Sequence, residues 1–175
     1  MFRFDEYVES WARQYKGLMH SEEHPAFFRV NSEYTLDEFI PGYTSIDYPI
    51  VCVITHLEGN LKGTKSLDDS SYKVLFLAPG IYNDYKNQAD AKYKCKELMH
   101  KFIMRIRYDK VRMKNNPTNA NSALLSINID DLPYDMIGPV LNNWHCLILN
   151  MSAMEAFGGC YTDADYADPS AICPL

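Results

Sequence analysis

One long amphipathic helix, predicted from Asp90 to Met113, constrains this chain more than any other feature. Apolar residues recur there with the helical period and share an arc of roughly 140°. They are Ala91, Cys95, Leu98, Met99, Phe102, Ile103, Ile106 and Met113. A helix with a single apolar face needs a second layer to pack against, so we expect the rest of the chain to supply a sheet.

The other faces of this helix are basic. Nine of the 17 Lys and Arg residues lie between positions 92 and 114, with only Glu97 and Asp109 to oppose them, although the chain carries a net charge of −6. A narrow stripe of His100, Met104 and Val111, bordered by Tyr108, lies opposite the apolar arc. One basic row beside it holds Lys94, Lys101, Arg105 and Arg112, and the other holds Lys96 and Arg107.

An apolar stripe with a charged rim is typical of a protein interface. We therefore predict a subunit interface made of Lys94, His100, Lys101, Met104, Arg105, Tyr108, Val111 and Arg112. The alternative is an ordinary solvated face, because a few exposed apolar groups occur on any protein surface.

The remaining segments indicate short strands and one further helix. Phe4 to Tyr15 has helical periodicity. Strands are predicted at 26–30, 48–57, 71–77, 123–129 and 144–152. Strands in neighbouring pairs favour an α+β fold, with an antiparallel or mixed sheet of about five strands packed by the long helix and the short N-terminal helix. We expect a single domain over residues 1–157 with a long hairpin loop at 58–70, and a C-terminal arm at 158–175 rich in Asp.

The motifs of common enzymes are missing from the sequence. It has no phosphate-binding glycine loop, no nucleophile elbow and no helical His-Glu zinc motif. The five Cys residues have no regular spacing. Their pairing with His at 52/56, 95/100 and 145/146 does not match the compact spacing of zinc sites. We predict no enzyme activity, no cofactor, no metal and a reducing compartment. No stretch approaches the roughly 18 apolar residues of a membrane span.

The order of elements resembles that of the tail-terminator, tail-completion and neck-ring (connector) proteins of tailed bacteriophages. The resemblance covers most of residues 1–156 and includes the Trp-containing closing strand from Asn143 to Met151 and the segment Ile127 to Pro133. Residues 31–47 look like an insertion, and the tail after Phe157 is longer than the family pattern. The resemblance implies a structural virion subunit that forms a homo-oligomeric ring at the neck or tail end.

On this hypothesis the partners are copies of the chain and adjacent portal, connector or tail proteins. The location is the virion, assembled in the host cytoplasm. The alternative is a small nucleic-acid-associated protein that uses the basic helix 91–114 to bind phosphates. The acidic remainder of the chain opposes a polyanion, so the first hypothesis is favoured.

Overall fold

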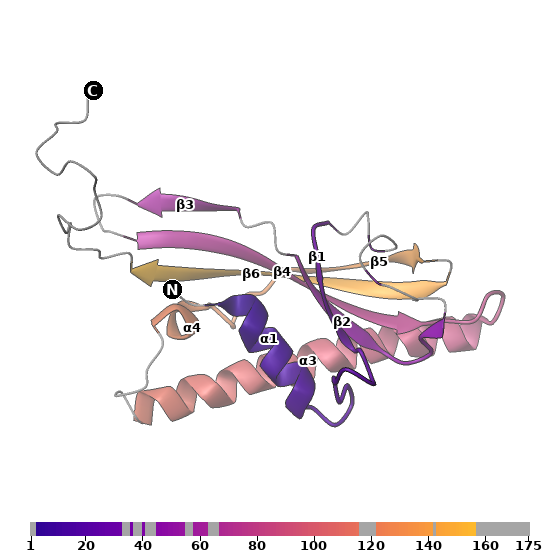
Figure 1. Ribbon diagram of the computed structural model, residues 1–175. Coiled ribbons are helices and arrows are strands. Elements are labelled where there is room, and N and C mark those ends of the chain that lie inside the picture. Colours follow the sequence, from indigo (N-terminus) through magenta and orange to yellow (C-terminus); the bar gives the residue numbers. More distant parts are fainter. Residues whose placement is uncertain are drawn as a thin grey trace, which may run out of the picture.

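The computed structural model describes residues 3–32, 36, 40, 45–54, 58–62, 67–115, 122–141 and 143–156. In chain order the elements are α1 (Phe4–Gln14), β1 (Phe27–Val30), β2 (Ile50–Ile54), β3 (Glu58–Lys62), β4 (Leu67–Pro79), α3 (Tyr85–Asn115), α4 (Ser122–Ser126), β5 (Tyr134–Val140) and β6 (Trp144–Ala156). Figure 1 shows α3 running along the two long strands β4 and β6, with α1 crossing near its middle. The predicted α+β fold is confirmed.

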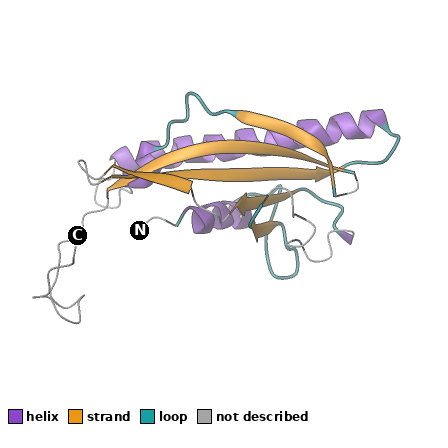
Figure 2. Cartoon of the chain, turned by 90° about the horizontal axis from the view of Figure 1, so that it is seen from above, coloured by secondary structure: helices purple, strands orange, loops and turns teal. Residues whose placement is uncertain are grey.

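The sheet is mixed, with strand order β1-β2-β4-β6-β5 and β3 paired to β4 off this path. β2 is buried along its whole length, as its continuous apolar run predicts. It pairs antiparallel with β4, from Ile50 opposite Leu77 to Val53 opposite Val74. β1 pairs with β2 in parallel, which makes the sheet mixed. Figure 2 shows the long helix and the long strands running side by side.

The predicted hairpin loop at 58–70 is wrong for most of its length. β3 occupies 58–62, and β4 begins at Leu67 and pairs with both β3 and β6. Residues 63–66 lie outside the described part. A polar sequence without apolar alternation forms strands here because two neighbouring strands satisfy the backbone hydrogen bonds of β4. Periodicity carries no signal for strands held in this way.

The strand predicted at 123–129 is also wrong. Residues 122–126 form the short helix α4, with buried Leu124, and buried Ile127 follows it. The edge strand beside β6 is instead β5, whose pairing begins with Tyr134 opposite Leu149. The Gly138-Pro139 pair lies inside this strand beside a register shift. Proline is tolerated there because β5 is an edge strand.

An aromatic cluster joins both helices to the sheet. Phe102 of α3 is fully buried and lies 5.0 Å from Trp11 of α1 and 5.9 Å from Phe76 of β4, measured between ring centroids. The helix residues predicted to be buried are buried or, for Ile103 and Met113, partly buried against the core. Full burial of a side chain the size of Leu, Ile or Phe contributes about 1.5–3 kcal/mol.

The segment 31–47, which the sequence marks as an insertion, supplies part of the core. Its described residues Leu36, Ile40 and Ile46 are all buried and belong to the same apolar cluster as the sheet. The segment is therefore integral to the domain at these positions.

Candidate interaction surface

The large exposed apolar side chains gather on α3 and the turn before it. In the described part of the chain they are Ile81, Tyr82, Tyr85, Tyr93, Met104, Tyr108 and Val111 here, and Met19, Tyr134, Met136 and Met154 elsewhere. The exposed fractions on α3 are large: 73% for Tyr93 and 60% for Met104. Seven of these eleven side chains therefore lie on one helix and the turn before it, which distinguishes this surface from scattered exposed residues.

Helix geometry places several of these residues in one row. At 100° per residue, Tyr93, His100, Met104 and Val111 share an arc of about 40° opposite the buried face, and Tyr108 borders it. We call these five residues the outer stripe. Tyr93 is absent from the predicted interface, although it stands seven residues before His100 and therefore on the same face. The helical period alone could have found it.

The predicted rim residues divide into two groups. Lys94 forms an ion pair with Glu97 at 3.0 Å, one turn along the helix. Arg105 forms an ion pair with Asp109 at 2.7 Å and donates a hydrogen bond to Gln14 of α1 at 3.0 Å. Arg105 therefore links α1 to α3. Its half-buried side chain is less available to a neighbouring molecule than the prediction supposed.

The other basic residues leave an uneven charge along the helix. Lys96 lies over the ring of Tyr134 at 5.8 Å, and Lys110 donates to the backbone oxygen of Ile127. Within the described ranges, no ion pair is formed by Lys101, Arg107, Arg112 or Lys114. These four exposed cations lie on both sides of the outer stripe and concentrate the positive charge on its C-terminal half.

Asp109 is an acid on the packed face of α3. It is buried and accepts hydrogen bonds from the Tyr7 hydroxyl at 2.9 Å and from Arg105 at 2.7 Å. Burial, with the nearby carboxylate of Asp109, raises the pKa of Tyr7 far above its usual range. The tyrosine therefore remains a neutral donor that satisfies a buried charge.

A second unusual group is His145 on β6. Its side chain is buried, and neither ring nitrogen has a hydrogen-bond partner among the described residues. A Cβ at Gly80 would lie 3.3 Å from its ring, and a Cβ at Gly138, where φ is +135°, would lie 3.2 Å from it. The two glycines thus give the ring its space. Burial, and secondarily the charge of Lys92, lowers the pKa of His145.

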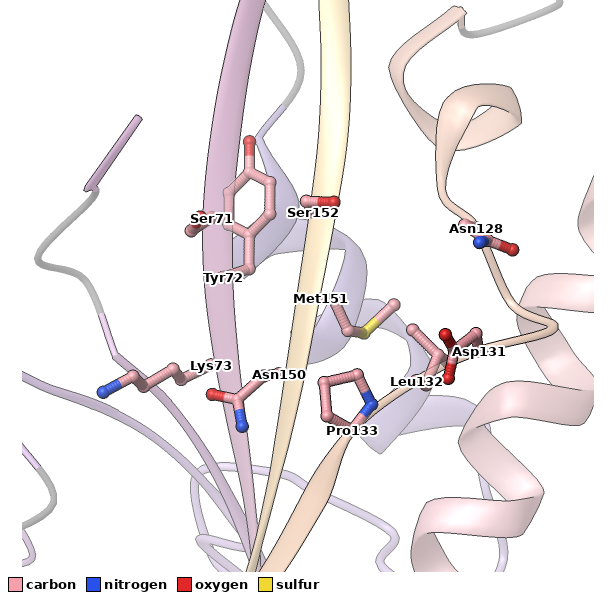
Figure 3. A pocket seen from close by; sticks show the side chains of 10 residues that line it. All are labelled: Ser71, Tyr72, Lys73, Asn128, Asp131, Leu132, Pro133, Asn150, Met151 and Ser152. Carbon is pink, nitrogen blue, oxygen red and sulfur yellow. The ribbon is translucent and has the colours of Figure 1, made fainter. Parts of the chain in front are cut away.

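One open hollow of about 390 Å³ lies between β4, β6 and the segment before β5. Figure 3 shows the Lys73 ammonium and the Asp131 carboxylate pointing apart, on opposite sides of the two strands. A ligand site needs polar groups that converge on a common point. The polar side chains of this hollow do not converge, so it gives no support to the idea of a small-molecule site.

The described thiols are poorly suited to nucleophilic catalysis. Cys52, Cys95 and Cys146 are all buried. Burial raises the pKa of Cys95 to about 12 and that of Cys52 further still, whereas a reactive cysteine needs a lowered pKa. The described residues contain no group of three His, Cys, Asp or Glu side chains suited to a metal ion. None of the helices in the described ranges is long and apolar enough to cross a membrane.

No protein-family model matches the chain, and a comparison with curated proteins finds no match.

Proposed function

We propose that this chain is a structural subunit that associates with copies of itself, of the kind that forms a ring at the neck or tail end of a tailed phage. The observation that carries the proposal is the outer stripe on α3. Met104, Tyr108 and Val111 are each about 60% exposed on a helix whose opposite face is fully packed. Burying such side chains in a neighbour would contribute about 1 kcal/mol or more each.

The chemistry of the remaining molecule supports a structural role. The thiols of Cys52 and Cys95 have raised pKa values, and the hollow beside β6 lacks converging polar groups. A ring subunit needs neither feature, since its function is to present complementary surfaces to its neighbours. We therefore propose no catalytic activity, and copies of this chain with adjacent portal, connector or tail proteins as partners in the virion.

The experiment that tests self-association compares two full-length variants by sedimentation velocity. Met104→Asp places a charge in the outer stripe, and Met19→Asp places one at a methionine of similar exposure (62%) on another surface. Met19 has a φ of 50°, a conformation that Asp adopts more readily than most residues. We expect Met104→Asp to weaken association at least about tenfold and Met19→Asp to leave it unchanged. Equal behaviour of the two variants would remove the stripe from the interface.

The place in a virion has a separate test. The gene for this chain should lie beside genes for portal, capsid or tail proteins. A neighbourhood of metabolic genes alone would contradict the phage assignment while leaving the self-association untouched.

A second candidate function is the binding of nucleic-acid phosphates. It is favoured by four exposed cations in the C-terminal half of α3 that form no ion pair within the described ranges: Lys101, Arg107, Arg112 and Lys114. Binding of this kind weakens steeply with salt. Retention of the full chain on a DNA column at low salt would favour it, and free elution would exclude it.

A further inference from the structure

The last described strand, β6, ends on the same side of the molecule as the basic C-terminal end of α3, and an acidic stretch of sequence follows it. β6 ends at Ala156, and α4 contacts both β6 and α3 at this end of the molecule (Figure 1). Residues 157–175 follow and contain Asp163, Asp165 and Asp168, with no Lys, Arg or His. Arg112 and Lys114, which form no ion pair with any described residue, lie in the last turn of α3 at the same end. The charges of the two regions are therefore complementary.

The segment also has the length and composition that the outer stripe requires. Its 19 residues span up to roughly 60 Å when extended, against about 46 Å for the 31 residues of α3. Large apolar side chains flank the acids: Phe157 and Tyr161 precede them, Tyr166 stands between Asp165 and Asp168, and Ile172 follows. Such a segment can cover an apolar stripe while its carboxylates meet a basic rim.

We propose that residues 157–175 of one copy bind along the outer stripe of α3 in a second copy. The choice of a second copy over the chain's own helix rests on the proposed function. The three Asp side chains then lie opposite Lys101, Arg107 and Arg112. The contact is heterologous, because tail and helix are different surfaces, and repetition of such contacts closes a ring when the rotation permits.

Charge reversal in full-length chains tests the proposal. One variant carries Asp163→Lys, Asp165→Lys and Asp168→Lys, and the other carries Lys101→Glu, Arg107→Glu and Arg112→Glu. Each variant alone should associate at least about tenfold more weakly than the wild type, because three rim pairs become repulsive. A mixture of the two should associate again, because each tail then meets a helix of opposite charge in the other variant. The exposed pair Glu22→Lys and Glu23→Lys serves as the control and should behave as the wild type.

Three results overturn the proposal. In the first, the Lys-tail variant associates as the wild type does. In the second, both variants are weakened but their mixture is not restored. In the third, the mixture stays weak but a single chain that carries both sets of changes associates as the wild type does, which would mean that the tail covers its own helix. If Met104→Asp still blocks association in the first case, the proposed self-association survives and only the tail contact fails. A wild type that is monomeric at every concentration would instead contradict the proposed function itself.

Discussion

At the scale of single residues, polar groups in the interior decide how the helices are fastened. The pattern of apolar residues predicts the buried face of α3 well, because that face follows the helical period. Asp109 shares the direction of Ala91 on the helix, so the helical period places it on the buried face, but the period does not identify its hydrogen-bond partner Tyr7, which is 102 positions away. Long-range polar pairs of this kind have no signature in one sequence.

The link between Tyr7 and Asp109 gives the first prediction at this scale. Tyr7→Phe removes one of the donors to a buried carboxylate, so we expect the free energy of unfolding to fall by about 1–3 kcal/mol. Chemical denaturation at pH 7 measures it. Tyr93→Phe removes an exposed hydroxyl from α3, the helix that carries Asp109. This matched control should unfold with a free energy within about 0.5 kcal/mol of the wild type. Equal losses in both variants would show that the contact with Asp109 is not responsible.

His145 predicts a dependence of stability on pH. Its pKa in the folded protein is lowered from 6.5, so the ring stays neutral when folded and takes up a proton on unfolding below about pH 6.5. The stability that this group contributes is therefore present above that pH and lost as the pH falls. Thermal unfolding between pH 8 and 5 should show a steeper loss for the wild type than for His145→Gln. Parallel curves for the two proteins would contradict the prediction.

At the scale of elements, the sequence predicts the helices and strands that bury apolar side chains, and it misses the strands that are held only by backbone bonds to their neighbours. The N-terminal helix, the long helix and the strands now seen as β1, β2, β4 and β6 all carry apolar signals, and all are found. β3 and β5 do not carry them, because their backbone bonds to β4 and β6 hold them in place. α3 also begins earlier than predicted because Asp84 caps it, accepting the Asn87 N–H at 3.0 Å.

α4 yields a prediction that concerns how an element is attached. The Ser126 Oγ donates to Ala123 and accepts the backbone N–H of Met154 at 2.6 Å, so it joins α4 to the edge of β6. Ser126→Ala should lower the free energy of unfolding by about 1 kcal/mol and speed hydrogen exchange at the Met154 amide. Ser152→Ala, at an exposed position on the same strand, should change neither. Unchanged protection at Met154 would refute this attachment.

At the scale of the whole molecule, the charge is divided between one helix and the remainder. The sequence predicts this division from the residue counts, and the helical period predicts every residue of the outer stripe except Tyr93. The helical spacing of Lys94 to Glu97 and of Arg105 to Asp109 could have indicated their ion pairs, whereas the hydrogen bond from Arg105 to Gln14 of α1 depends on the tertiary fold. The structure therefore moves the proposed contact toward Tyr93, Met104 and Val111, with Lys101, Arg107 and Arg112 as the rim.

The most direct test of the central claim is the molar mass of the wild-type, full-length chain, measured by sedimentation velocity over a wide range of concentrations. The account predicts discrete species at multiples of the mass of the 175-residue chain, with their proportion rising with concentration and falling with salt. A single monomeric species at every concentration and at low salt would contradict it.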